Sequence, residues 1–131
     1  MNDVSTKLVL CVMAAGALGT LSRFLSVRLL YPGGESSFPH ATVVINIAGA
    51  FLAGLIYMLL KGKFAHLGNM APLLLVGYLG AFTTFSTFAL ESVNLILAGE
   101  YGKATLNVVL QNALGLSAAL GGVFTGRLLN G

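Results

Sequence analysis

The sequence carries very little charge for its length. Of its 131 residues, 8% are charged and 56% are hydrophobic, whereas roughly 25% of the residues in an ordinary soluble domain are charged. This balance excludes a fold whose main solvent is water. The formal net charge of +3 comes from residues in short links, so it does not indicate a surface that binds nucleic acid.

Groups that carry chemistry are scarce as well. Cys11 is the only cysteine, which excludes an intrachain disulfide, and its apolar surroundings indicate a small buried side chain. His40 and His66 lie at predicted helix ends with no cysteine or carboxylate at ligand spacing, so we interpret both as interfacial residues. The chain has no glycine-rich nucleotide loop, so we expect no bound nucleotide and no enzyme activity.

Four apolar stretches account for most of the chain. A membrane-spanning helix needs about 20 mostly apolar residues, and suitable stretches run over about 8–30, 41–60, 71–97 and 104–129. The links between them are short and polar, so we expect a single membrane domain over 1–131 with four transmembrane helices and an all-α fold. The first stretch is too long for a cleaved signal peptide, so we expect it in the mature protein.

Positive charges are only weakly biased towards one side of the membrane. With four spans, one side carries Lys7, Lys61, Lys63 and Arg127, and the other carries Arg28 and Lys103, plus Arg23 if its side chain reaches outward. Because a clear Lys/Arg excess normally sets orientation, this weak bias permits insertion both ways. A four-helix bundle of this size has little room for a path within one subunit, so transport would need an oligomer. The simplest closed assembly is an antiparallel two-fold dimer.

Several polar residues fall inside the apolar stretches, where each must face protein, an ion or water. Arg23 shares a helix face with Gly16, Gly19 and Thr20, and one interpretation is a buried structural cation bound to carbonyls at a helix end. In the second stretch Asn46 precedes Ala50 and Gly54 at four-residue spacing. Its amide either joins helices or donates hydrogen bonds to an anion.

The fourth stretch leaves a similar choice open. Gln111 and Asn112 serve either packing or a pathway, while Ala118, Gly122 and Gly126 form a small-residue ridge for helix contact.

The third stretch has an unusual centre, because residues 77–88 read GYLGAFTTFSTF. Glycines and β-branched hydroxyl residues weaken a helix, so we expect a break near 77–84. Broken helices are tolerated at membrane depth where their freed carbonyls line a cavity or hold an ion. Carbonyls around Gly80 and Thr83 are suited to a monovalent cation.

An aromatic series follows the same stretch. Phe82, Phe85, Phe88 and Glu91 recur at three-residue spacing, which predicts one helix stripe. Such a stripe serves packing, or its electropositive ring edges stabilise a partly dehydrated anion. The hydroxyls of Thr83, Ser86 and Thr87 form a neighbouring face that can donate hydrogen bonds to the same anion.

Residues 80–91, GAFTTFSTFALE, resemble the GGxTTFSTFSxE motif of the Fluc (CrcB) family of fluoride channels. Gly19 to Arg23 and the segment Asn46-Ile47-Ala48-Gly49 support the resemblance, which covers essentially the whole chain. It implies an antiparallel, dual-topology homodimer in the bacterial plasma (inner) membrane. Such a dimer has two pores and exports fluoride passively down its gradient.

The resemblance also implies roles for particular residues. Phe85 and Phe88 would be the pore phenylalanines, Asn46 the pore-lining amide, and Ser86, Thr87 and Glu91 would line the fluoride path. The carbonyls of Gly80 and Thr83 from both subunits would hold a central structural sodium ion. The chain departs from the family pattern at Ala81, which replaces a glycine, and in the fourth helix, where Asn112 is polar but Val108, Leu116 and Leu120 are apolar.

Two other functions compete with a channel. A small proton-coupled multidrug transporter needs a membrane-embedded carboxylate, for which Glu91 is the only candidate. A scaffold subunit held together by small-residue ridges would leave the central Thr/Ser/Phe segment unexplained.

Overall fold

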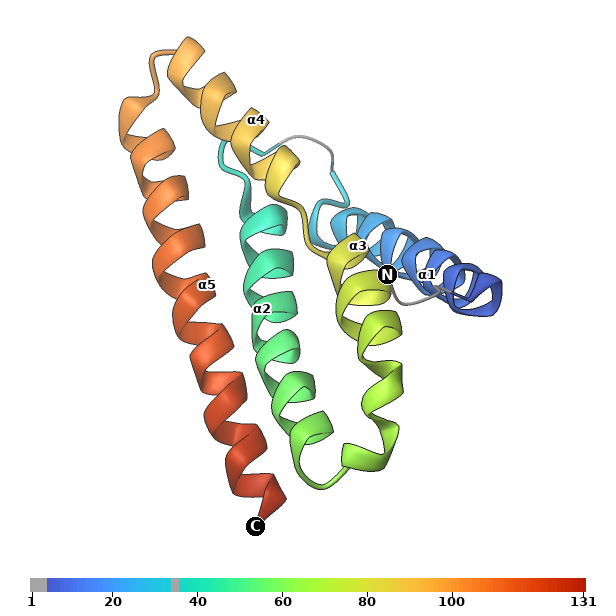
Figure 1. Cartoon of the computed structure of the whole chain (residues 1–131). Coiled ribbons are helices and arrows are strands. Elements are labelled where there is room, and N and C mark those ends of the chain that lie inside the picture. The colour runs from blue at the N-terminus through green and yellow to red at the C-terminus, as the bar shows by residue number, and fades with distance from the viewer. Residues whose placement is uncertain (1–4, 34–35) are drawn as a thin grey trace.

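The computed structural model describes residues 5–33 and 36–131, and every regular element in these ranges is helical. The elements are α1 (Thr6–Leu30), α2 (His40–Lys61), the 3-10 helix η1 (Ala65–Met70), the π-helix η2 (Pro72–Leu79), α3 (Gly80–Phe82), α4 (Phe85–Leu97) and α5 (Tyr101–Asn130) (Figure 1). The segments η2, α3 and α4 together form the third span, Pro72–Leu97. Within the described residues, four spans are long and apolar enough to cross a membrane, which confirms the predicted all-helical class and the number of spans.

Local sequence explains where several helices begin and end. The Ser5 hydroxyl accepts a hydrogen bond from the Leu8 N–H at 3.2 Å and caps α1. Gly99 ends α4 with a φ of 75°, a left-handed conformation that favours glycine. Helix α5 begins at Tyr101, earlier than predicted, and an ion pair between Glu100 and Lys103 at 3.2 Å spans its first turn.

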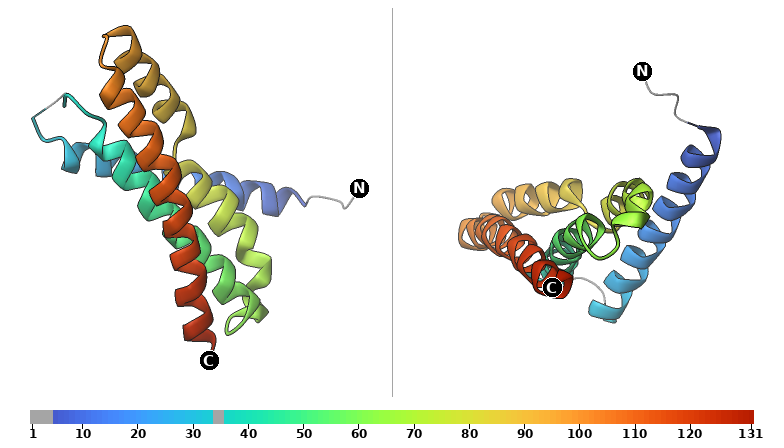
Figure 2. Two further views of the ribbon diagram at one scale, coloured as in Figure 1. Left: turned by 90° about the vertical axis from the view of Figure 1, so that its left-hand side faces the viewer. Right: turned by 60° about the horizontal axis from the view of Figure 1, so that its bottom comes forward.

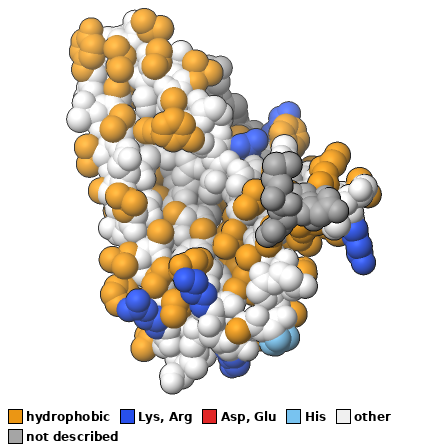
Figure 3. Space-filling model, in the orientation of Figure 1, with side chains coloured by type: hydrophobic (Ala, Val, Ile, Leu, Met, Phe, Trp, Pro, Cys, Tyr) orange, Lys and Arg blue, Asp and Glu red, His pale blue; other side chains and the backbone are white. Residues whose placement is uncertain are grey.

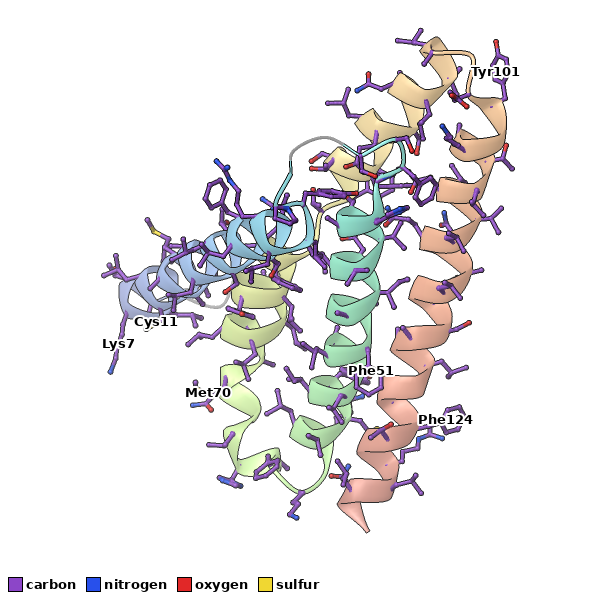
Figure 4. All side chains as sticks on the ribbon, turned by 180° about the vertical axis from the view of Figure 1, so that it is seen from behind. Lys7, Cys11, Phe51, Met70, Tyr101 and Phe124 are labelled. Carbon is purple, nitrogen blue, oxygen red and sulfur yellow. The ribbon has the colours of Figure 1, made fainter. Side chains whose placement is uncertain are left out.

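The helices form two packed groups rather than a closed four-helix bundle. Helices α2 and α5 lie side by side, whereas α1 packs against η2 and α3. Both views in Figure 2 show α1 lying across the direction of the other helices. Lys7 and Cys11 lie on the part of α1 that projects away from α2 and α5, which carry Phe51 and Phe124 (Figure 4).

Glycines allow α2 and α5 to approach closely. A Cβ at Gly54 would collide with the Ala119 carbonyl, and a Cβ at Gly122 would collide with the Phe51 carbonyl and stand 2.7 Å from the Leu55 nitrogen. Both glycines belong to the small-residue ridges predicted from sequence, and these ridges form the helix contact as expected.

Much of the apolar surface remains uncovered in one subunit. In the most apolar 18-residue stretch of each span, only 6% to 22% of the residues are buried. Figure 3 shows apolar side chains spread over the visible face, with Lys and Arg both near the end where α5 terminates and on the side of α1. So large an exposed apolar area suits lipid or a second protein surface.

Adjacent glycines on α5 provide a matched test of this packing. We expect Gly122→Ala to lower stability by about 1–3 kcal/mol because the added methyl group overpacks the contact with α2. Gly121→Ala is the control, since its nearest neighbouring atom would lie 4.0 Å from the new Cβ. Thermal unfolding in detergent measures both. Equal midpoints for the two variants would contradict the packing observed at Gly122.

Candidate functional site

The helical backbone of the third span is interrupted at two threonines. Helix α3 ends at Phe82 and α4 begins at Phe85, while Thr83 (ψ 160°) and Thr84 (φ −149°, ψ 108°) are extended. The side chain of Asn46 on α2 pairs with both backbone groups of Thr84. Its Oδ1 accepts from the Thr84 N–H at 2.8 Å, and its Nδ2 donates to the Thr84 carbonyl at 3.1 Å.

This pairing changes the partners of two earlier carbonyls. In a continuous α-helix the Thr84 N–H would bond to the Gly80 carbonyl and the Thr87 N–H to the Thr83 carbonyl. Instead, the Thr84 N–H goes to Asn46, and the Thr87 N–H donates to the Thr84 hydroxyl at 3.3 Å. The Gly80 and Thr83 carbonyls are thereby released from these helical hydrogen bonds, so their oxygens are free to meet another donor or a cation.

Arg23 lies against one of the released carbonyls. Its Nη1 donates to the Thr83 carbonyl oxygen at 3.3 Å. A cation bound to carbonyls at a helix end is one of the interpretations that the sequence left open for Arg23.

An open groove of about 350 Å³ lies between α2, the third span and α5. Its lining includes these residues singled out from sequence: Asn46, Gly80, Thr83, Phe85, Phe88, Gln111 and Asn112. The rings of Phe85 and Phe88 meet edge-on, with centroids 5.5 Å apart, and the Phe85 side chain is 78% exposed. Asn112 is exposed and donates to the Val108 carbonyl of its own helix at 2.8 Å.

Three of the predicted hydroxyl and carboxylate residues, Ser86, Thr87 and Glu91, lie outside this groove, whereas Thr83 lines it. Thr87 lines a smaller hollow together with Thr42, Thr84 and Arg23. Glu91 lines a third hollow, shared with Arg28. Ser86 is exposed and belongs to the lining of none of these three hollows.

Glu91 has one satisfied and one unsatisfied carboxylate oxygen. The Thr42 hydroxyl donates to Oε1 at 2.7 Å. Oε2 is buried and has no hydrogen-bond partner among the described residues. Because a buried polar atom without a partner is costly, this oxygen marks a position suited to a further donor.

The prediction of a single aromatic stripe is wrong for Phe82. Its ring stacks on Tyr78, with centroids 6.2 Å apart and planes 5° from parallel. The extended backbone at Thr83 and Thr84 resets the helical phase, so Phe82 does not continue the series formed by Phe85 and Phe88.

A series of hydrogen-bonded side chains extends from Asn46 through α5 to α4. Asn46 Nδ2 donates to Gln111 Oε1 at 2.7 Å, Gln111 Nε2 to Asn107 Oδ1 at 3.3 Å, and Asn107 Nδ2 to Ser92 Oγ at 3.0 Å. Sequence reasoning left Gln111 between packing and a pathway, and it missed Asn107 and Ser92. The signal was the four-residue spacing of Asn107 and Gln111 within an apolar helix, where each polar side chain needs a partner.

These features define a class of protein. Four apolar helical spans, an interrupted third span and polar side chains gathered around that interruption are typical of a small membrane channel or transporter. The chain belongs to the CrcB family, whose family model, described as CrcB-like protein, Camphor Resistance (CrcB), matches residues 10–123. This confirms the resemblance inferred from the sequence motifs.

Individual relatives match over nearly their full length. A protein of Desulforapulum autotrophicum is 41% identical over 90% of this chain and 94% of its own. One of Hydrogenovibrio crunogenus is 40% identical over 97% of this chain and 96% of its own, and one of Coxiella burnetii is 38% identical over 92% and 98%. Each is named a fluoride-specific ion channel FluC. The family is one of channels and not of enzymes, as predicted.

The role of Asn46 can be tested without a transport assay. We expect Asn46→Asp to lower stability by about 1–3 kcal/mol, because an oxygen that replaces Nδ2 cannot donate to the Thr84 carbonyl or to Gln111. Asn94→Asp on the exposed part of α4 makes the same chemical change and serves as the control. Thermal unfolding in detergent compares the two. A midpoint for Asn46→Asp no lower than that of the control would show that the pairing with Thr84 contributes little.

Proposed function

We propose that this protein is a fluoride-selective channel that lets fluoride leave the cell passively across the bacterial plasma (inner) membrane. The observation that carries the proposal is the interruption at Thr83 and Thr84, which begins α4 at Phe85 and sets Phe85 and Phe88 beside a groove containing amides. Relatives named for fluoride conduction share 38% to 41% of their residues with the chain over nearly its whole length.

Fluoride holds its water strongly, so a channel must replace that water without binding the ion tightly. Several weak donors in series meet this requirement. The ring edges of Phe85 and Phe88 supply partial positive charge, and the hydroxyls of Ser86 and Thr87 supply hydrogen bonds. Glu91 and Asn112 would lie along the same route, from the hollow beside Arg28 to the groove.

The amides of Asn46 and Gln111 have different roles in this proposal. Both Nδ2 hydrogens of Asn46 are engaged, one with Thr84 and one with Gln111. Asn46 would therefore donate to fluoride only after it releases Gln111. Gln111 Nε2 carries two hydrogens and uses one of them for Asn107, so Gln111 adds a donor to the groove that sequence reasoning did not assign.

The functional unit would be an antiparallel, dual-topology homodimer with two pores. The large exposed fraction of Phe85 and the open side of its groove support this, because a second copy could complete the wall of the path. The weak charge bias of the loops permits the two opposite insertions that such a dimer needs. The third span would cross the membrane as a broken helix, with its break at membrane depth.

A structural sodium ion would sit where the two broken spans cross. The Gly80 and Thr83 carbonyls suit such an ion, since unwound backbone carbonyls are typical sodium ligands in membrane proteins. The Thr83 carbonyl also accepts from Arg23, but a carbonyl oxygen has two lone pairs. Two carbonyls are too few to enclose an ion, so a second copy would supply the others.

Proton-coupled drug exchange is the alternative that one observation favours. Glu91 is half-buried, lines the largest of the three hollows and keeps one carboxylate oxygen without a partner among the described residues. A cationic drug that displaces a proton would need such a group.

Fluoride efflux from liposomes separates these functions. A fluoride electrode records release after valinomycin is added to potassium-loaded liposomes that contain the purified protein. We expect fast fluoride release with little chloride release, and loss of at least about nine-tenths of the fluoride rate in Phe85→Ile, because an aliphatic side chain lacks electropositive ring edges.

Phe124→Ile on α5 is the matched control, since Phe124 is also exposed but lies outside the groove. Fluoride release that is equal in the two variants would remove Phe85 from the path. No release from folded wild-type protein would reject the channel and direct attention to drug exchange through Glu91.

Sodium stoichiometry tests the cation separately. Protein purified in choline buffer and equilibrated with radioactive sodium should retain one ion per two chains, because each chain contributes only part of the carbonyl set. Potassium at the same concentration is the control for selectivity. Protein that conducts fluoride but retains no sodium would refute the structural ion and leave the channel in place.

A further inference from the structure

The hydrogen-bonded side chains between α2, α5 and α4 are attached to the backbone at both ends. At one end Asn46 pairs with the N–H and the carbonyl of Thr84. At the other end the Ser92 hydroxyl donates to the Phe88 carbonyl at 2.8 Å. Gln111 and Asn107 connect the two ends. We call these four side chains, Asn46, Gln111, Asn107 and Ser92, the amide relay.

The backbone groups at the two ends of the relay impose one consistent direction of donors and acceptors on the amides between them. A backbone N–H only donates, so Asn46 must present Oδ1 to Thr84 and turn Nδ2 towards Gln111, which then accepts through Oε1. A backbone carbonyl only accepts, so the Ser92 hydrogen is used on Phe88, and Ser92 Oγ must accept from Asn107. Asn107 then turns Oδ1 towards Gln111 Nε2. The oxygen and nitrogen of a side-chain amide have nearly the same shape, so shape alone does not fix which way the amide points. Here both ends of the series require the same orientation.

Burial removes water as an alternative partner at the far end of the relay. Asn107 has 0% and Ser92 has 7% of its surface exposed. An amide that lost its neighbour at this depth would leave a buried donor or acceptor unpaired, which is costly. A change at Ser92 should therefore be transmitted to Gln111 rather than absorbed by solvent.

We propose that Ser92 and Asn107 are positioning residues that orient the Gln111 amide and thereby hold Asn46 on Thr84. In this role neither residue contacts the permeating ion. They maintain the interruption of the third span, on which the released carbonyls and the start of α4 at Phe85 depend. The consequence for conduction rests on the proposed function, whereas the orientation of the amides does not.

A pair of substitutions at Ser92 separates hydrogen bonding from packing. Ser92→Ala removes the hydroxyl and should lower fluoride efflux roughly fivefold or more, as expected from the loss of a buried hydrogen bond. Ser92→Thr keeps the hydroxyl and should conserve most of the rate, although it adds a methyl group. A purely packing role predicts the reverse order. Ser117→Ala, an exposed position on α5, is the matched control.

A spectroscopic measurement tests the relay without relying on conduction. Gln111 is the only glutamine in the chain, so side-chain ¹⁵N labelling of glutamine gives the NMR signals of this amide alone. Ser92→Ala and Asn107→Leu should both shift these signals and speed hydrogen exchange at Nε2, whereas Ser92→Thr and Ser117→Ala should leave them close to wild type.

The outcomes distinguish the two proposals. Gln111 signals that are unchanged in Ser92→Ala and in Asn107→Leu would overturn the relay, whatever the flux. Wild-type protein that conducts no fluoride would overturn the channel, while the NMR comparison would still decide the relay. If Ser92→Thr does not fold, the comparison of Ser92→Ala with Ser117→Ala gives the decision.

Discussion

The pairing of Asn46 with the backbone of Thr84 determines how the third span can depart from a helix. In hydrocarbon each unsatisfied backbone group costs several kcal/mol, which is why spanning segments are normally continuous helices. Under the proposed function the interruption at Thr83 and Thr84 lies at membrane depth, where it creates such groups. Asn46 satisfies the N–H and the carbonyl of Thr84 with one side chain, at 2.8 and 3.1 Å, and the Thr84 hydroxyl caps the next helix through the Thr87 N–H. These contacts satisfy backbone groups that a continuous helix would satisfy within itself.

The close contact between α2 and α5 supports the pairing of Asn46 with Thr84. Gly54 and Gly122 bring the two helix backbones together, and this approach lets Gln111 reach Asn46 at 2.7 Å. The small-residue ridges therefore contribute more than general packing, because they set the distance at which the amide relay can form.

The main features of the fold could be predicted from the sequence because each depends on local composition. Apolar length predicts the four spans, and four-residue spacing of small residues predicts that α2 and α5 each pack closely against another helix. The structure shows that they pack against each other. The exact position of the interruption was harder to predict, because it depends on a contact with another helix, the hydrogen bonds that Asn46 on α2 makes with Thr84. Gly77 and Gly80 weaken a helix, yet both lie in helical turns, and the backbone departs only where Asn46 can take the Thr84 N–H. Because the backbone is extended at Thr83 and Thr84, Phe82 does not share a helix face with Phe85 and Phe88. A single aromatic stripe across Thr83 was therefore the wrong prediction.

The sequence identified which residues are candidates for the site, but it did not predict which of them lie together. The motif singled out Phe85, Phe88, Thr87 and Glu91, but their separation into different hollows depends on how α4 packs against α2 and α5. Ser92 and Asn107 gave a weak signal because a lone polar residue in an apolar helix has many possible partners. Only the structure pairs them, at 3.0 Å and almost without exposure.

The amide relay and the groove place opposite demands on the polar side chains. Atoms that hold the interruption must keep their partners, whereas donors that meet a passing anion must exchange partners rapidly and bind weakly. The engaged amides of Asn46 and Asn107 suit the first task. Hydroxyls, whose hydrogens rotate freely, and exposed ring edges such as that of Phe85 suit the second. Under the proposed function, fluoride therefore passes along the hydroxyls and exposed ring edges. The hydrogen-bonded amides maintain the interruption of the third span.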